Sequence, residues 1–474
     1  MKSMELSDAE FRRLAAEVAA LSAEFLSSLD TRASFPETSG EATERLFSRE
    51  MPLRGMGAEA LAGLRDVMEH SRVQNGRFFG YVQGPGEPVA ALGDLFASIL
   101  NQNMTAWRSS PGGITVERTV VRWLAEAVGC RGFWGTLTGG GSAANLMGLA
   151  MAREAKTPGN EHGLWGARAG VIYASEQVHM AVPKAVAMLG IGREHLRYIA
   201  CDDAYRMVPS ALEKAIRQDT ERGRTPLAVV ASAGTVNTGA IDPLREIAQV
   251  AHAHRVWVHV DGAYGALAAI AAPEKFQGLE LVDSISLDPH KWMYQPLDCG
   301  CLLYRDAAMA RQTFLYTGSY AKQLSVDPVE GFAYFEESIE LSRRFRGLKL
   351  WLSWRYHGLE GFRAAIQRDL EHAQRLARAI DATPELERLA PVELSAVCFR
   401  HRVSDGASEE ERNRFNLALL KRVLARRRVY LSNAELRGRF CLRTCMVNPL
   451  TKDSDVDAVV AEVLEAAREV GADW

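Results

Sequence analysis

The sequence predicts an α/β protein with a mostly parallel central sheet, a smaller C-terminal α+β domain and an N-terminal helical arm. Three observations lead to this class: globular composition, short β-branched runs alternating with helical stretches, and a change of rhythm after Gly358. Of the 474 residues, 47% are hydrophobic and 24% are charged, which excludes disordered, collagen-like and coiled-coil chains. We divide the chain into an arm (1–75), a large domain (76–357) and a small domain (358–474).

Charge, apolar runs and cysteine content limit the partners and the cellular compartment that we expect for this protein. The formal net charge is −3, and nucleic acid or an anionic membrane would require a basic footprint, so we expect neither as a partner. The longest charge-free run, between Arg131 and Arg153, is too rich in glycine for a membrane span. The first residues lack the apolar core of a secretory signal. Seven cysteines without a CxxC pair argue against a disulfide framework or a metal site and favour a cytoplasmic protein.

The arm begins with a predicted amphipathic helix at residues 7–29. Its apolar side chains recur three and four positions apart, and Ser7 with Glu10 matches a capping box. Such a stripe packs either on the parent domain or on a partner subunit. Residues 31–58 are rich in Pro, Gly, Ser and Glu and predict an irregular segment.

The large domain alternates strand and helix. The predicted strands are 171–174, 227–231, 256–260, 284–287 and 301–304, with helices at 142–155 and 243–254 among them. This alternation predicts a mostly parallel sheet with helices on both faces. After Gly358 the small domain follows, with helices predicted at 359–381, 408–427 and 454–470 and strands at 392–400, 429–432 and 439–446.

A glycine-rich run, TGGGSAAN from Thr138 to Asn145, opens an apolar helix. Successive glycines let the backbone approach a ligand closely. A helix N-terminus also directs free N–H groups and the positive end of its dipole toward that ligand. The pattern is therefore typical of an anion site, most often for phosphate. The same pattern also occurs in plain loops, and it matches neither the Walker loop nor the dinucleotide fingerprint.

Two polar residues close neighbouring predicted strands. Asp261 ends VWVHVD, and Lys291 lies in DPHKW, about one βα unit later and directly after SISL. Ligands of α/β folds bind at the carboxyl ends of parallel strands. Asp261 could instead cap a helix, and Lys291 could instead extend to solvent. A desolvated lysine at this edge, however, can act as a nucleophilic amine at neutral pH.

His179 follows the predicted strand 171–174 and so lies at the same end of the sheet. A lone histidine is more often structural, but here it joins a lysine, an acid and a helix N-terminus. These are the parts that hold pyridoxal phosphate through a Schiff base, the pyridine nitrogen and the phosphate. An anionic Asp261 would keep the ring nitrogen protonated, and a flat imidazole could cover the ring.

Six strings of the sequence resemble one family. They are RFFGYV, WRSSPGGITVER, GGGSAANLMGLAMAR, HVDGAYG, DPHKW and SRRFRGLKLWLSWRYHG. Together they resemble the group II pyridoxal-phosphate-dependent amino-acid decarboxylases, closest in pattern to the aromatic-L-amino-acid decarboxylases. The resemblance covers residues 78–358 and, more loosely, both ends. It implies the fold-type-I, aspartate-aminotransferase-like architecture and a homodimer with shared active sites. On this reading the arm is a dimerisation segment and the large domain binds the cofactor.

The resemblance implies a role for each matching residue. Lys291 would form the Schiff base with the cofactor, Asp261 would pair with the pyridine nitrogen, and His179 would stack on the ring near the substrate carboxylate. Residues implied to bind the phosphate side of the cofactor are Gly141 and Ser142, with His290 and Thr235 as further candidates. Two positions depart from the family pattern. Asp288 stands where many members have asparagine, a second anion that is unfavourable there unless it turns to backbone donors, and Val236 stands where many have threonine.

Residues 315–338 resemble the mobile catalytic loop of the family. Counting back from Arg343 in SRRFR, the loop tyrosine of the family falls on Tyr334, which would return a proton to the substrate carbon after carbon dioxide leaves. The related aldehyde synthases tend to have phenylalanine there, so Tyr334 favours simple decarboxylation. Tyr334 could instead be a surface tyrosine beside Phe332 and Phe335.

The side chain of the substrate is predicted from the presumed pocket strings. Phe79, Tyr81 and Trp107 fall in strings that line this pocket in the family, and aromatic walls suit an aromatic substrate unless these residues are ordinary core. Arg108 could instead bind an acidic side chain. We therefore expect decarboxylation of an aromatic L-amino acid to its amine. The alternatives are an acidic substrate (glutamate, aspartate or a sulfinate), an aldehyde synthase, another fold-type-I reaction, or a non-catalytic cofactor-binding protein.

Overall fold

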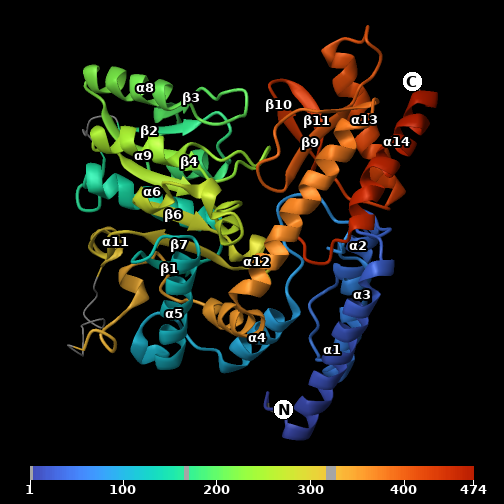
Figure 1. Ribbon diagram of the computed structural model, residues 1–474. Helices are drawn as coiled ribbons and strands as arrows, with labels where there is room; N and C mark the ends of the chain where they lie inside the picture. Colours follow the sequence, from blue (N-terminus) through green and yellow to red (C-terminus); the bar gives the residue numbers. More distant parts are fainter. Residues whose placement is uncertain (1–3, 165–169, 317–326, 474) are drawn as a thin grey trace.

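The computed structural model describes residues 4–164, 170–316 and 327–473 (Figure 1). Part of the predicted loop, residues 317–326, therefore lies outside the described residues. A seven-stranded sheet forms the large domain, in the order β1-β7-β6-β5-β4-β2-β3. Its strands are β1 (Trp134–Thr138), β2 (Gly170–Ser175), β3 (Leu196–Ile199), β4 (Thr225–Ser232), β5 (Trp257–Asp261), β6 (Ser284–Leu287) and β7 (Gly300–Tyr304).

The predicted fold class is confirmed. Five neighbouring strands, from β6 to β3 in sheet order, pair in parallel, whereas β7 runs antiparallel to both β1 and β6. All five strands predicted in the large domain are present. Strands β1 and β3 were not predicted. The first is interrupted by Gly135 and the second is only four residues long with Arg197 inside it, so neither shows a β-branched run.

Helices cover both faces of this sheet because successive side chains of a strand point to opposite sides. Val229 and Ala231 of β4 belong to one core cluster, and Ala228 and Val230 belong to the other. The helices packed on the first face are α5 (Pro111–Ala127), α8 (Pro209–Glu221) and α9 (Leu244–Ala253). Those on the second face are α6 (Gly141–Lys156), α7 (Ala181–Met188) and α11 (Ala307–Phe314). Two layers of helices therefore enclose the sheet and leave its edges to the connecting loops.

The small domain is built on an antiparallel sheet in the order β10-β11-β9-β8. Its elements are β8 (Leu386–Arg388), β9 (Ala396–His401), α13 (Glu409–Arg426), β10 (Ser432–Leu436), β11 (Arg439–Cys445) and α14 (Asp453–Asp473). The long helix α12 (Arg346–Asp381) joins the two sheets (Figure 1). Leu350 of α12 packs in the large-domain core and Leu376 packs in the small-domain core. Gly358, with φ of 69°, interrupts the helix between these two halves.

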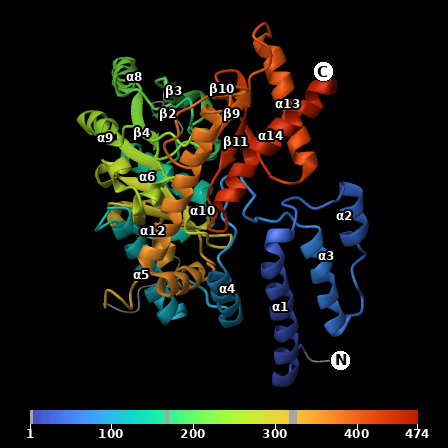
Figure 2. The ribbon, with the colours of Figure 1, turned by 45° about the vertical axis from the view of Figure 1, so that its right-hand side comes forward.

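The N-terminal arm stands apart from the two sheets, with α1 (Asp8–Ser28) beside α3 (Gly63–Glu69) (Figure 2). The predicted first helix is confirmed, and the Ser7 side chain accepts a hydrogen bond from the Glu10 N–H. The prediction of an irregular segment at 31–58 is wrong in part. Residues Gly40–Phe47 form α2, and the Ser39 side chain caps its start by accepting a hydrogen bond from the Ala42 N–H. Helix α4 (Pro88–Leu100) then leads into the large domain.

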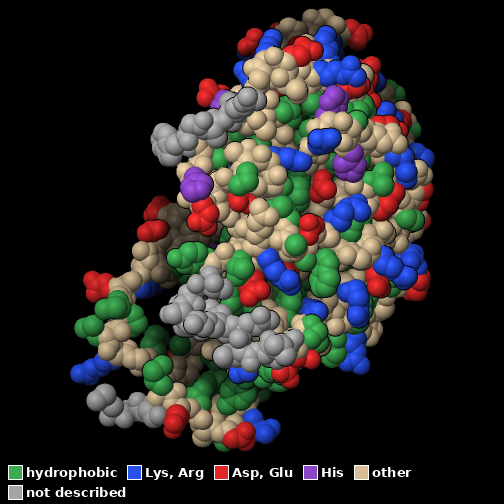
Figure 3. All heavy atoms as spheres, turned by 90° about the vertical axis from the view of Figure 1, so that its left-hand side faces the viewer, with side chains coloured by type: hydrophobic (Ala, Val, Ile, Leu, Met, Phe, Trp, Pro, Cys, Tyr) green, Lys and Arg blue, Asp and Glu red, His purple; other side chains and the backbone are tan. Residues whose placement is uncertain are grey.

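Across the described residues, we find no helix whose length and apolar content would let it traverse a bilayer. On the face drawn in Figure 3, positive and negative side chains are interspersed. This mixture agrees with the small net charge of the sequence.

Candidate active site

The residues singled out by the sequence meet at the carboxyl edge of the large sheet. Asp261 is the last residue of β5, and β6 is followed at once by Asp288 and the short helix α10 (Pro289–Trp292), which contains Lys291. Strands β5 and β6 pair in parallel, with Asp261 opposite Ser286. This register places the segment that carries Lys291 next to Asp261, as the parallel arrangement predicts.

Lys291 is largely buried and pairs with Asp288. Its Nζ lies 2.9 Å from Asp288 Oδ2, and His290 Nε2 lies 3.5 Å from the same oxygen. His290 Nδ1 accepts a hydrogen bond from the Cys299 N–H at 3.3 Å. The Asp288 charge is thus directed at the Lys291 and His290 side chains. Its Oδ1 is buried and has no hydrogen-bond partner among the described residues.

The glycine-rich turn begins a helix, as predicted. Gly140 is the N-cap of α6 with φ of 133°, a conformation that L side chains rarely adopt. A Cβ on Gly141 would lie 2.6 Å from the Ala263 Cβ and 3.0 Å from Asp288 Oδ2. Ser142, in the same first turn, is exposed. The N–H groups of a first helical turn have no intrahelical acceptors, so this turn presents free donors between the two strand ends.

Asp261 is nearly buried and is surrounded by neutral donors. Ser286 Oγ and the Ala263 N–H donate to Oδ1, both at 3.2 Å, and Asn145 Nδ2 donates to Oδ2 at 3.0 Å. Hydrogen bonds to a carboxylate favour its charged form. Among the described residues, no lysine or arginine forms an ion pair with Asp261. Its charge therefore remains available to a cationic group such as a protonated pyridine nitrogen. This arrangement fits pyridoxal phosphate, the cofactor predicted from the sequence.

His179 lies in the same cluster. The Ala181 N–H donates to its Nδ1 at 3.2 Å, so the ring proton resides on Nε2. Burial lowers the pKa of His179, and the charges that act on it include those of Asp261, Lys291, Asp288 and Lys184. The ring is therefore neutral at physiological pH and presents Nε2–H as a donor.

Thr235 is buried in the loop that follows β4. Its hydroxyl lies 2.9 Å from the Thr238 hydroxyl and accepts the Ala240 N–H at 3.2 Å. This side chain therefore closes its own loop. The neighbouring Asn237 donates to the Gln177 side chain at 3.3 Å, which ties the loop to the segment that carries His179.

The three predicted pocket residues lie in different environments. Phe79 is fully buried in the core of the small domain with Phe399, which favours the core alternative for this residue. Tyr81 is 49% exposed, and its hydroxyl lies 3.3 Å from that of Tyr430. Trp107 is partly buried and packs against the cluster that contains Phe332. Of the three, Tyr81 offers the most accessible surface.

Tyr334 is also fully buried, in the short 3₁₀ segment Tyr334–Glu336. Its ring lies 4.3 Å from the Arg343 guanidinium and packs edge-on against Phe332 at 4.8 Å. Burial raises its pKa well above the ordinary range, and its hydroxyl has no hydrogen-bond partner within the described part of the chain. The alternative of a surface tyrosine is therefore wrong. The contacts of Tyr334 are with this cluster rather than with Lys291.

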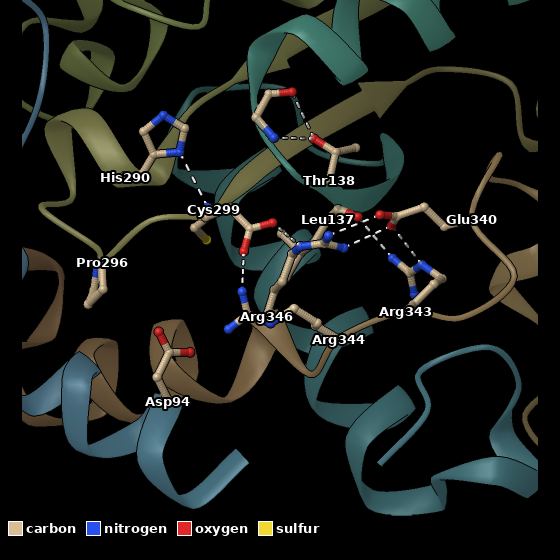
Figure 4. A network of polar contacts seen from close by, with 12 residues as sticks. Asp94, Leu137, Thr138, His290, Pro296, Cys299, Glu340, Arg343, Arg344 and Arg346 are labelled. Atoms are coloured by element: carbon tan, nitrogen blue, oxygen red, sulfur yellow. Dashed lines mark hydrogen bonds and ion pairs between the residues drawn. The ribbon is translucent and has the colours of Figure 1, made fainter. Parts of the chain in front are cut away.

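The SRRFR motif supports the glycine-rich turn from the adjacent loop (Figure 4). Arg343 is fully buried, and its Nη2 donates to the Leu137 carbonyl of β1 at 2.9 Å. Arg346 Nε pairs with Asp298 Oδ2 at 2.9 Å, and that oxygen would lie 3.4 Å from a Cβ on Gly139. Arg343 therefore anchors the strand that leads into the turn, and Arg346 holds the Asp298 side chain beside it.

Arg443, which was not predicted from the sequence, also lies in this region. Arg443 is buried in β11, where its Nη1 donates to the Tyr81 carbonyl at 3.3 Å and its Nε to the Asn237 carbonyl at 3.0 Å. Its Nη2 is buried without a partner among the described residues. The sequence could have indicated Arg443 as a charged residue that alternates with Cys441 and Cys445 on one face of β11.

Comparisons with known proteins agree with this geometry. A profile described as the pyridoxal-dependent decarboxylase conserved domain matches residues 64–402. The chain is 33% identical to an aromatic-L-amino-acid decarboxylase of Bacillus atrophaeus, over 99% of this chain and 98% of that protein. It is 30% identical to a phenylacetaldehyde synthase of Petunia hybrida, over 87% and 85% respectively. A solved structure of Oryza sativa TDC with PLP and tryptamine superposes with a TM-score of 0.92 at 27% identity, covering 99% of both chains.

Proposed function

The chain belongs to the pyridoxal-dependent decarboxylase family, and from this premise we propose that it decarboxylates an aromatic L-amino acid to the corresponding amine. Membership makes it a carboxy-lyase whose cofactor is pyridoxal phosphate. The observation that carries the proposal is the cluster of Lys291, Asp261, His179 and the Gly141 turn at one sheet edge. The likeness to an aromatic-L-amino-acid decarboxylase over nearly the whole chain supports the aromatic substrate class.

The residues of the cluster fit this cofactor. Lys291 would hold it covalently, Asp261 would hold a proton at the ring nitrogen, and the free N–H groups of Gly141 and Ser142 would bind the phosphate. The bound cofactor supplies an electron-withdrawing ring that accepts the electron pair of the breaking bond to the carboxylate. His179, neutral with a donor at Nε2, would bind the substrate carboxylate. The nearly buried position of Asp261 limits access of water to its charge.

A second candidate is decarboxylation of an acidic amino acid. The buried Nη2 of Arg443, beside Tyr81 and without a partner among the described residues, favours it. A guanidinium with an unpaired N–H can bind a carboxylate or sulfinate strongly. Arg108, the residue that raised this alternative in the sequence, is exposed.

We propose that the protein works as a homodimer. Helix α1 has no buried residue in the single chain. Helix α4 exposes a row of large apolar side chains, Leu92, Leu95, Phe96 and Ile99. Contiguous exposed apolar surface of this kind is typical of an interface. Sedimentation velocity should give the mass of a dimer, and Leu95→Asp together with Phe96→Asp should give the monomer.

The proposed function is tested by carbon dioxide release over a panel of amino acids, with hydrogen peroxide measured in parallel. The panel contains phenylalanine, tyrosine, tryptophan, glutamate, aspartate and cysteine sulfinate. We expect release from the aromatic members without stoichiometric peroxide. Release from the acidic members alone would support the second candidate, and peroxide matched to turnover would identify an aldehyde synthase.

A lysine variant checks that the activity belongs to this site. Lys291→Ala should lose the absorbance of the cofactor–lysine bond and nearly all turnover. Lys214→Ala, an exposed lysine on α8, serves as the control and should retain both. Normal turnover in Lys291→Ala would refute the assignment.

A further inference from the structure

A chain of buried polar side chains extends from Asp261 into the space between α6 and the sheet. Asn145 Nδ2 lies 3.0 Å from Asp261 Oδ2, and His259 Nε2 lies 2.8 Å from Asn145 Oδ1. His259 Nδ1 lies 2.8 Å from Ser284 Oγ, which also lies 2.9 Å from Trp257 Nε1. We call these four residues, Asn145, His259, Ser284 and Trp257, the Asp261 relay. All four are buried.

The chemistry of its end members fixes the direction of every hydrogen bond in the relay. The Asp261 carboxylate only accepts, so Asn145 donates to it through Nδ2 and its Oδ1 accepts from His259 Nε2. The neutral His259 ring therefore accepts the Ser284 hydroxyl hydrogen at Nδ1, and Ser284 Oγ accepts the indole N–H of Trp257. The ring proton of His259 then resides on Nε2 and is donated to Asn145 Oδ1. Asn145 is thereby oriented with its NH₂ group toward Asp261. All the hydrogen bonds point the same way and end on the carboxylate.

Two further observations show that the surroundings of His259 suit its place in the relay. Burial lowers the pKa of His259, so the ring is neutral, as the single proton on Nε2 requires. A Cβ on Gly148 of α6 would lie 2.6 Å from both Cε1 and Nδ1 of His259. The glycine therefore leaves the space that the imidazole occupies between the helix and the sheet.

We propose that Asn145 and His259 are positioning residues that keep Asp261 ionised and directed toward the ring nitrogen of the cofactor. This inference rests on the role of Asp261 in the proposed function. A buried carboxylate that loses a donor binds a proton more tightly. Without the relay, the shared proton would move from the ring nitrogen to Asp261. The ring would then withdraw electrons less strongly.

The test measures the protonation of the ring nitrogen directly. Apoprotein is reconstituted with pyridoxal phosphate labelled with ¹⁵N in the ring, and the ¹⁵N resonance of the holoenzyme is recorded together with the dissociation constant of the cofactor. We expect Asn145→Ala to shift the resonance toward that of an unprotonated pyridine. We also expect it to weaken cofactor binding about tenfold, the effect of one charge-assisted hydrogen bond. His259→Phe should shift the resonance in the same direction by a smaller amount.

One control and one further relay variant complete the test. Asn416→Ala removes a buried asparagine of the small domain that bonds to the His401 backbone, and it should leave the resonance unchanged. Ser284→Ala is a smaller change than either relay variant above. It removes the donor that sets the His259 tautomer and should still shift the resonance if the other variants fail to fold.

The outcomes distinguish the relay from the proposed function. If Asp261→Ala shifts the resonance while the relay variants keep the wild-type signal, the relay inference is overturned and the role of Asp261 stands. If Asp261→Ala itself leaves the resonance unchanged, the proposed role of Asp261 is overturned, and the relay inference with it. A graded shift in the order Asp261, Asn145, His259 supports both.

Discussion

At Gly141 an added methyl group would lie 2.6 Å from the Ala263 Cβ and 3.0 Å from Asp288 Oδ2. Real Cβ atoms are not found that close to a neighbouring carbon, so Gly141→Ala should push α6 away from the ends of β5 and β6. We expect cofactor binding to weaken about tenfold or more, because the N–H donors of the turn move with the helix. Fluorescence titration of the apoprotein with pyridoxal phosphate measures this change.

Gly112→Ala is the matched control for that prediction. Gly112 lies in the first turn of α5, and no atom of the described residues lies within 4 Å of an added Cβ, so cofactor affinity should stay at its wild-type value. Equal affinities for the two variants would show that the space around Gly141 is less restricted than the structure indicates.

The Tyr334 hydroxyl gives a second prediction at this scale. A buried hydroxyl without a hydrogen-bond partner is destabilising, so Tyr334→Phe should raise the free energy of unfolding by about 1 kcal/mol. Tyr304→Phe provides the contrast, because the Tyr304 hydroxyl donates to Glu337 Oε2 at 2.5 Å and its loss should destabilise the protein. Urea denaturation of both variants measures the difference. A Tyr334→Phe variant of normal stability that no longer decarboxylates would instead support the catalytic role expected from the sequence.

The residues at strand ends were predictable, and those inside elements were not. Asp261 and Lys291 follow apolar runs directly, and parallel strands bring their carboxyl ends to one edge. The surroundings of Phe79 and Tyr334 could not be predicted, because whether an aromatic side chain faces a site or a core depends on packing that the sequence does not display. Asn145 and His259 were missed since each is a single polar residue within an apolar helix or strand, with no local sign of its partner.

At the scale of elements, one buried lysine holds α4 against α12. Lys349 is fully buried, and its Nζ lies 2.9 Å from Asp94 Oδ2 and 2.8 Å from the Pro296 carbonyl. Asp94→Ala would leave this ammonium buried without its counter-ion, which costs about 3 to 5 kcal/mol. Lys349→Met removes the ammonium group, so no unpaired cation is left buried. The loss in free energy of unfolding should therefore be much smaller than for Asp94→Ala. Thermal and urea unfolding of the two variants should therefore differ clearly, and equal losses would contradict this account of the contact.

Helices and strands with a clear apolar periodicity were predicted from the sequence, and those without one were not. Helix α13 (Glu409–Arg426) agrees with the prediction, because Ser408 and Glu411 form a complete capping box. Strand β8 (Leu386–Arg388) was missed because three residues cannot show a pattern. The sequence predicted a helix only from residue 359, whereas α12 starts at Arg346 and changes direction at Gly358. The positive φ of that glycine separates two helical segments that lie end to end.

At the scale of the whole molecule, Asp369 links the two domains. Its Oδ2 accepts the Tyr294 hydroxyl of the large domain at 2.9 Å and the Asn448 N–H of the small domain at 3.1 Å. Burial raises the pKa of Asp369 to about 7, above the value of about 3.9 for an unfolded chain. Between these two values the folded protein binds one more proton. Its stability should therefore fall as the pH rises toward 7, by about 1.4 kcal/mol per pH unit from this group.

Asp369→Asn should flatten this dependence between about pH 5 and 7, because the amide does not titrate. Urea unfolding at several pH values measures the slope. Asp457→Asn is the control. Asp457 is exposed beside Arg375, which lowers its pKa, so its loss should leave the slope in this range unchanged. An unaltered slope in Asp369→Asn would mean that another group is responsible.

The order of strands in the large sheet has a consequence for synthesis of the chain. Strand β7 is the last of the seven in sequence, yet it lies between β1 and β6, and a Cβ on Gly300 would lie 2.4 Å from the Gly140 Cα. Until β7 has left the ribosome, the segment bearing the glycine-rich turn has no neighbour to pair with. A nascent chain arrested before residue 300 should therefore fail to retain pyridoxal phosphate, even if its other strands have formed. The cofactor-binding cluster thus forms late, because it needs a contact between distant parts of the sequence that is slow to form.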